Sequence, residues 1–131
     1  AAAGVNASIS DMAQYLKMVM GEYPQVADNS LLTQVFQPYV PIPAAGYMLR
    51  EWKPFESAHY AMGWRVIERV GYTIITHSGY VNGYRAEIAF CPEEQVGIVL
   101  LSNAPNYTVG QAAPTFFERY FTTYALKQPT T

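Results

Sequence analysis

The sequence predicts an α+β fold in which an antiparallel sheet of three to four strands packs against helices from both ends of the chain. Short runs of β-branched and aromatic residues fill the second half of the chain, glycine, asparagine and proline separate these runs, and segments with helical spacing flank them. The expected strands span about residues 61–70, 72–78, 84–91 and 96–102. At 131 residues, the chain is predicted to form a single segment of one domain, residues 1–131.

Two helices are expected before the sheet. The first spans residues 6–21, because Ser8 and Asp11 have the spacing of a capping box and apolar residues then recur every three or four positions. The second covers residues 28–37, where Asp28, Asn29 or Ser30 is a candidate cap and Pro38 ends the helix. Residues 39–60 contain three prolines and a glycine, so we expect an ordered, largely irregular connection.

The sheet segment contains clear turn signals. The strand expected at residues 72–78 runs into His77, Ser78 and Gly79, and a loop with Asn82 and Gly83 returns the chain as the next strand. The strand at 96–102 is apolar at successive positions, which favours a central strand covered by helices on each side. A last amphipathic helix follows; Pro114 suits a start near residue 112 or 113 and would kink a helix that began at 109.

Composition excludes several classes of function. The formal net charge is -2 and no lysine- or arginine-rich run occurs, so we expect no nucleic-acid partner. No stretch approaches the roughly 20 apolar residues of a membrane span, and the first residues lack the charged-then-apolar pattern of a leader, so we expect neither feature in this sequence. Neither His59 nor His77 has neighbours typical of a metal site, so we expect no metal and no other cofactor. Cys91, the single cysteine, is interpreted as a small buried apolar group.

Several phrases of the sequence occur together in a fixed order. They are G-V-N-A-S-I-S-D-M-A-Q-Y-L near the start, Y-A-M-G-W-R-V in the middle, and then H-S-G, N-G-Y, F-x-P-E-x-x-x-G-I-V and L-S-N. In this order and spacing they resemble the C-terminal part of the class C β-lactamase family, which includes penicillin-binding-protein-like esterases and D-aminopeptidases. The resemblance spans nearly all of the chain but only about a third of a full family member.

The resemblance implies roles for five residues. The family's third motif consists of a basic residue, a hydroxyl residue and a glycine. His77 takes the place of its lysine and Ser78 that of its threonine or serine, which makes both catalytic candidates. Substrate-binding candidates are Ser78, Gly79, Tyr80, whose backbone N–H would serve the oxyanion hole, and Asn103, which matches the asparagine ending the family's final strand. An ordinary histidine titrates near pH 6.5 against about 10.4 for lysine, so carboxylate recognition would weaken and an esterase or peptidase is favoured over a dedicated β-lactamase. The alternative is that His77 and Ser78 are hydrogen-bonded strand-end residues without a catalytic role.

The family's nucleophile motif, S-x-x-K, is missing, because none of the six serines is followed three residues later by lysine. Tyr80 and Asn82 form a Y-x-N triplet, but it falls directly after the third motif and is interpreted as a coincidence. We therefore expect a C-terminal fragment of a serine hydrolase that acts on a small-molecule substrate such as a β-lactam, ester or peptide, and that is inactive alone. The alternative is a non-catalytic binding or interaction module with the same fold.

The resemblance also implies partners and a location. In the family, strands from the N-terminal region complete the sheet, so the missing N-terminal portion of the same protein is the expected partner. Without it, an unpaired strand edge would promote self-association. Family members are commonly exported, which implies a periplasmic or secreted parent. The first residues fit either a chain cut from something longer or a processed N-terminus.

Overall fold

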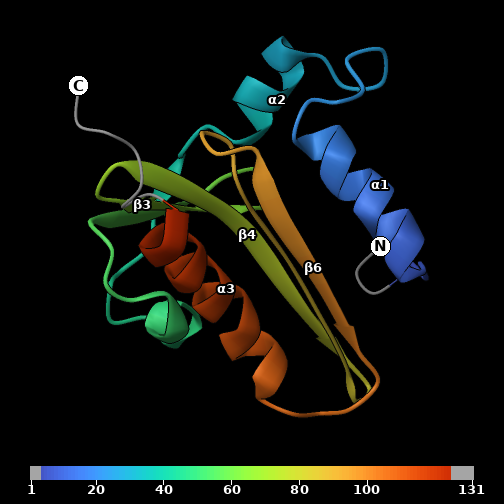
Figure 1. Cartoon of the computed structure of the whole chain (residues 1–131), viewed down its shortest axis with the longest axis vertical. Helices are drawn as coiled ribbons and strands as arrows, with labels where there is room; N and C mark the ends of the chain where they lie inside the picture. Colours follow the sequence, from blue (N-terminus) through green and yellow to red (C-terminus); the bar gives the residue numbers. More distant parts are fainter. Residues whose placement is uncertain (1–3, 125–131) are drawn as a thin grey trace.

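The computed structural model describes residues 4–124, apart from the side chains of Tyr47 and Met48. A six-stranded antiparallel sheet forms its centre, with the strands side by side in chain order (Figure 1). They are β1 (Val40–Pro41), β2 (Ser57–Tyr60), β3 (Arg65–Arg69), β4 (Tyr72–Val81), β5 (Tyr84–Cys91) and β6 (Val96–Ser102). The α+β class and the antiparallel sheet are confirmed, and the sheet has two more strands than the upper expectation.

Helices cover both faces of the sheet. Helix α1 (Ile9–Val19) packs on β6 from one side, while α3 (Thr108–Tyr124) packs on β5, β6 and the 3-10 helix η1 (Tyr47–Trp52) on the other (Figure 1). The short α2 (Asn29–Val35) follows α1. None of the helices in the described part of the chain is both long and apolar enough to cross a membrane.

Both N-terminal helices begin at the caps that the sequence indicates. At α1, the backbone N–H of Asp11 donates to Ser8 Oγ at 3.2 Å and the backbone N–H of Ser8 donates to Asp11 Oδ2 at 2.9 Å, which completes the capping box. At α2, the side chain of Asp28 accepts from the backbone N–H of Leu31 at 2.8 Å. These short-range bonds satisfy N–H groups that the first helical turn leaves free.

The expectation of an irregular connection over residues 39–60 is wrong in three places. Strands β1 and β2 and helix η1 all lie in this range. Strand β2 pairs along its whole length with β3, and β1 adds two residues at the sheet's edge. Proline is tolerated in β1 because an edge strand can leave its N–H side unpaired.

The first expected strand is shorter than residues 61–70. Residues 61–64 form a turn, in which the backbone N–H of Ala61 donates to the carbonyl of Trp64 at 2.7 Å and Gly63 has a φ of 78°. Strand β3 therefore begins at Arg65. Glycine reaches this positive φ without the steric penalty that a Cβ would bring, which explains the turn.

Strand β4 is longer than expected and includes three residues that we placed in a loop. It continues to Val81, and only Asn82 and Gly83 connect it to β5. Their φ values of 48° and 87° are both positive, as in the type I′ turn that Asn-Gly favours. Gly79 and Tyr80 consequently lie on a strand, paired with Ala86 and Arg85 of β5.

Strand β6 is covered on both faces, as its apolar sequence predicts, but within residues 4–124 it lies at the edge of the sheet rather than at its centre. Helix α1 approaches it closely at Gly97, where a Cβ would lie 3.0 Å from both methyl carbons of Leu16 and from the Cβ of Phe90. Glycine is the residue that this approach allows.

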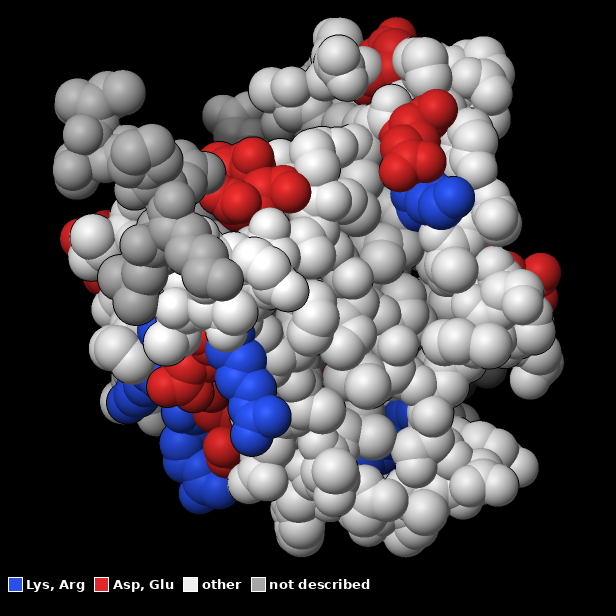
Figure 2. All heavy atoms as spheres, in the orientation of Figure 1, with Lys and Arg blue, Asp and Glu red and all other residues white. Residues whose placement is uncertain are grey.

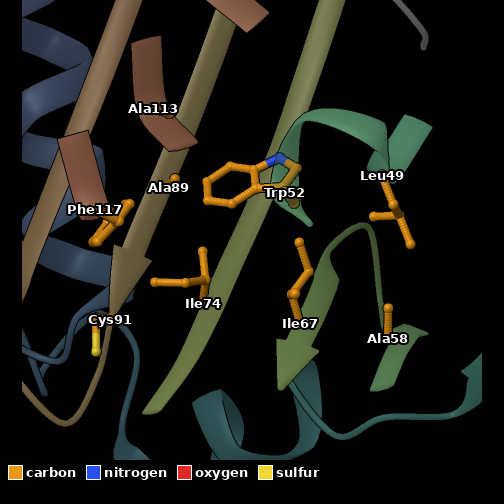
Figure 3. Close-up of a cluster of buried hydrophobic side chains, with 9 residues drawn as sticks. All are labelled: Leu49, Trp52, Ala58, Ile67, Ile74, Ala89, Cys91, Ala113 and Phe117. Carbon is orange, nitrogen blue, oxygen red and sulfur yellow. The ribbon is translucent and has the colours of Figure 1, made fainter. Parts of the chain in front are cut away.

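The core has two layers, one on each side of the sheet. Figure 3 shows the layer beneath α3 and η1, in which side chains of the sheet, of η1 and of α3 converge. Its buried members are Leu49, Trp52, Ala58, Ile67, Ile74, Ala89, Cys91, Ala113 and Phe117. Cys91 is fully buried, as predicted, and burial raises the pKa of its thiol to about 12. The layer beneath α1 and α2 centres on Trp64 and Phe90, whose rings meet edge to face.

Helix α3 starts earlier than Pro114 suggests. It begins at Thr108 and carries Pro114 inside it. Proline has no N–H, so the carbonyl of Gly110 receives no backbone hydrogen bond from that position. Ala113 and Pro114 are both buried, and Ala113 belongs to the core layer against the sheet, so tertiary packing outweighs the local helix preference here.

Candidate active site

A cavity of about 670 Å³ lies beside Arg65, the first residue of β3, where β4 and β5 extend further than β3 does. Three of the predicted site residues, His77, Ser78 and Gly79, line it, as does Tyr80. Its other walls come from η1, from the end of β2 and from the start of α3. Thus the structure brings four of the five sequence-predicted residues together in one concave site.

The cavity borders an open stretch of strand edge. Strand β3 pairs with β4 only along Tyr72–Thr76, and from His77 to Val81 β4 is paired with β5 alone among the described strands. In the described part of the chain, the backbone of this stretch therefore has a neighbouring strand on one side only. An edge of this kind presents N–H and C=O groups to a ligand or another chain.

His77 is half-buried at this edge. Its Nε2 lies 3.1 Å from the hydroxyl of Tyr60, and the two rings meet edge to face. Burial, followed by the nearby charge of Arg65, lowers the pKa of His77 below its ordinary 6.5. The imidazole is therefore predominantly neutral at neutral pH, and it supplies even less positive charge than an ordinary histidine would.

Ser78 is exposed in the cavity, and its hydroxyl accepts a hydrogen bond from an arginine that the sequence analysis did not identify. Arg65 Nη1 donates to Ser78 Oγ at 3.3 Å. Arg65 is only 5% exposed, which is rare for a charged side chain. The fixed positive charge beside the third-motif hydroxyl thus comes from β3 rather than from residue 77.

Glu87 is a second buried charged residue of the cavity that sequence analysis missed. It lies opposite Ser78 in the β4–β5 ladder and is 5% exposed. Burial raises its pKa to about 7, against the opposing effects of the charge of Arg65 and of the neighbouring hydroxyl of Thr76. The sequence signal was present: Glu87 is the one charged residue in the otherwise apolar segment 86–91 of β5.

Arg85 and two tyrosines form the outer rim. The Arg85 guanidinium lies 4.9 Å from the ring centre of Tyr80 and 5.6 Å from that of Tyr107, both of which are largely exposed. Its Nε is buried and has no hydrogen-bond partner. Arginine between aromatic rings is a stable arrangement that also leaves donors for a ligand.

Asn103 lies apart from the other candidates. It is exposed, in a bend after β6, and does not line this cavity. Its substrate-binding role stays a prediction. Across residues 4–124, no group of three or more His, Cys, Asp or Glu side chains is arranged to hold a metal ion.

Two comparisons with known proteins gave a match. Residues 1–118 match the family model described as Beta-lactamase. Among solved structures, the chain is similar to the octameric penicillin-binding protein homologue from Pyrococcus abyssi, with a TM-score of 0.66 and 24% sequence identity. That similarity covers 86% of this chain and 24% of the homologue's chain, so this chain spans about a quarter of the length of the protein it resembles. No match was found among curated protein sequences.

Proposed function

The chain belongs to the β-lactamase family, and we propose on this premise that it is the C-terminal portion of a class C-like serine hydrolase. In the parent protein, this portion supplies one wall of the active site. The parent hydrolyses a β-lactam, an ester or a D-amino-acid peptide through an acyl-enzyme. The match to a quarter of the longer homologue is consistent with a portion of this kind.

The observation that carries the proposal is the placement of His77 to Tyr80 along an open strand edge that borders a cavity of about 670 Å³. Acyl transfer needs N–H groups aimed at the position where the oxyanion develops. An unpaired strand edge offers such groups, and we assign this role to the backbone N–H of Tyr80. The hydroxyl of Ser78, fixed by Arg65, contacts the substrate rather than attacking it.

The nucleophile is assigned to chain that lies outside this sequence. A serine needs an adjacent base to attack a carbonyl, and the family's base is the lysine of S-x-x-K. No serine of this chain has that lysine, so the chain alone should not hydrolyse substrates by the family route.

The substrate class follows from His77. Because its pKa lies below 6.5, His77 gives no steady positive charge for the carboxylate of a β-lactam. Residue 77 therefore does not supply the cation of a dedicated β-lactamase, which favours an esterase or peptidase, although the buried Arg65 places a positive charge beside Ser78. A neutral imidazole beside the hydroxyl of Tyr60 can instead accept and return a proton during acyl transfer.

The partner of this portion would pair with β6. Its outer edge has no strand beside it within residues 4–124, and β6 contains neither a charged residue nor proline. Figure 2 shows that the surface along β6 is almost entirely uncharged, with the charged side chains gathered towards the margins. Native edges are usually protected by charges or proline, so this edge fits a covered strand. We propose that the N-terminal portion of the same protein covers it and that, in its absence, the chain self-associates there.

Reading the coding sequence upstream of Ala1 tests the proposal. An in-frame S-x-x-K followed by Y-x-N would support the hydrolase portion. A start codon and leader directly before Ala1 would instead favour the second candidate, a binding module that keeps the fold without the chemistry. An export signal upstream would support a periplasmic or secreted parent.

A further inference from the structure

His77 and Tyr60 form a polar pair in the wall of the cavity. Nε2 of His77 lies 3.1 Å from the Tyr60 hydroxyl, and the two ring centres are 6.1 Å apart with an angle of 72° between the ring planes. Both residues line the cavity. Tyr60 lies outside the third motif, and the proposed function gives its hydroxyl no role of its own.

Tyr60 can reach His77 because β3 begins at Arg65. In the sheet, β3 lies between β2 and β4, and Arg65 is opposite Tyr60 on one side and opposite Thr76 on the other. His77 is the next residue of β4 and is not paired with a residue of β3. The side chain of Tyr60, the last residue of β2, therefore meets His77 beyond the start of β3.

The hydrogen bonds of the His77 ring indicate which group donates. A phenol can donate or accept, whereas a neutral imidazole has one N–H and one nitrogen with a free lone pair. Burial and then Arg65 lower the pKa of His77, and a hydrogen bond with the backbone of Ser78 acts in the opposite direction. A ring N–H that donates to a backbone acceptor has this effect, since it favours the protonated ring. Nδ1 is the ring nitrogen nearer to the backbone, so the lone pair remains on Nε2, which faces Tyr60.

We propose that Tyr60 is a positioning residue for His77: its hydroxyl donates to Nε2 and thereby holds the neutral ring in the tautomer that carries its proton on Nδ1. The inference rests on the proposed function for the role of the imidazole and deepens it, because it identifies Nε2 as the basic nitrogen. The hydrogen bond at one ring nitrogen commonly determines the protonation of the other. Free histidine prefers the opposite tautomer, so the site would reverse the intrinsic preference of the ring.

Two contacts of different kinds fix the ring. The hydrogen bond sets the distance and direction of Nε2 from the Tyr60 oxygen. The edge-to-face packing of the two rings limits rotation of the imidazole. A group that transfers protons must present its lone pair at a defined place, and these contacts provide that place.

Nuclear magnetic resonance of the ring nitrogens tests the tautomer. Long-range proton–nitrogen correlation spectra are recorded on the isotope-labelled 131-residue chain at pH 8, where His77 is neutral because its pKa lies below 6.5. The ring nitrogen without a proton resonates far downfield of the nitrogen that carries one. The chain contains two histidines, so His59→Gln assigns the signals. We expect the major form of His77 to carry its proton on Nδ1, and a major form with the proton on Nε2 would overturn the proposal.

Tyr60→Phe removes the hydroxyl and keeps the ring. The ratio of the two tautomers of His77 should then move about fivefold towards protonation on Nε2, the factor that one hydrogen bond supplies. Tyr39→Phe is the matched control, because the Tyr39 hydroxyl also makes one hydrogen bond, to the carbonyl of Gln34 at 3.0 Å, and Tyr39 does not line the cavity. This control should leave the tautomers of His77 unchanged.

Two results for the variants would contradict the proposal. An unchanged tautomer ratio in Tyr60→Phe would show that the hydroxyl does not hold the ring. An equal change in Tyr39→Phe would show a general effect of a lost hydroxyl. Backbone amide spectra report whether each variant is folded, and the measurement on the unmodified chain decides the tautomer even if a variant does not fold.

The experiment separates this inference from the proposed function. Its readout is the state of one ring rather than turnover, so its failure leaves the hydrolase assignment standing. Conversely, a coding sequence without S-x-x-K upstream of Ala1 would contradict that assignment and leave the tautomer result intact.

Discussion

Strand β4 is buried along its first half and open along its second. In the first half, flanked by β3, Ile74 and Thr76 are fully buried and Ile75 is nearly so. In the second half, Ser78, Gly79 and Tyr80 are exposed, and β3 has ended. One continuous strand therefore contributes to the buried core at one end and to the candidate active site at the other. The rigid half positions the open half, since both share one ladder with β5.

The largest effect should come from the buried half. Ile74→Ala removes a fully buried side chain from the core layer of Figure 3 and should lower the free energy of unfolding by about 4 kcal/mol. Val81→Ala, at the open end of the same strand, should cost less than about 1 kcal/mol, because Val81 is 43% exposed. Urea unfolding of both variants measures the difference. Equal losses would show that the two halves do not differ as described.

The next largest effect is the pH dependence that Glu87 gives to stability. Between the ordinary carboxyl pKa of 4.5 and about 7, the folded chain keeps a proton on Glu87 that the unfolded chain has released. The folded state binds more protons in this window, so its stability falls as pH rises and levels off above pH 7. Relative to Glu87→Gln, the chain should lose on the order of 2 to 3 kcal/mol from pH 5 to pH 8. Parallel stability curves for the two proteins would contradict a buried, neutral carboxyl group.

A smaller effect is expected at Thr76, where the two halves meet. Its hydroxyl donates to the carbonyl of Ile88 at 2.9 Å in a fully buried position. Thr76→Val keeps the shape and removes the bond, which should cost about 1 to 2 kcal/mol by urea unfolding. Thr123→Val, at an exposed position of α3, is the matched control and should change stability by less than about 0.5 kcal/mol. If both variants behave alike, the buried hydroxyl has no structural role.

The smallest effect should come from the open half. A Cβ at Gly79 would meet no atom within 4 Å, so Gly79→Ala should shift the free energy of unfolding by less than about 0.5 kcal/mol. Thermal or urea unfolding tests this. A loss of several kcal/mol would mean that the backbone at Gly79 is packed rather than open, and the cavity would then not be the site of a ligand.

Much of the fold was predictable because local signals specify it. The caps at Ser8 and Asp28, the Asn82–Gly83 turn and the period-two strands all act over a few residues. Strands β1 and β2 were missed because they are short and become strands only through pairing with β3. The edge position of β6 was missed for a related reason, since its apolar sequence reports its covered faces and says nothing of its neighbours.

The candidate site was predictable only where residues are contiguous. His77, Ser78, Gly79 and Tyr80 stand together in the sequence, so a motif could identify them. Arg65, by contrast, reaches the site only because β3 and β4 pair in a register that brings it opposite Thr76 and within hydrogen-bonding distance of Ser78. A single charged residue in a strand is compatible with a solvated face, and the sequence alone gave no reason to prefer burial. Register, rather than composition, made Arg65 and Glu87 part of the cavity.

The central claim is that the open half of β4 is one wall of a hydrolase site. The nucleophile of that site lies on a part of the protein outside this sequence. Incubation of the 131-residue chain and of Ser78→Ala with nitrocefin and with a p-nitrophenyl ester tests it most directly. Both proteins should release chromophore no faster than buffer, because no serine here has the lysine that would activate it. Turnover by the unmodified chain that Ser78→Ala abolishes would place the nucleophile within this polypeptide and contradict the account.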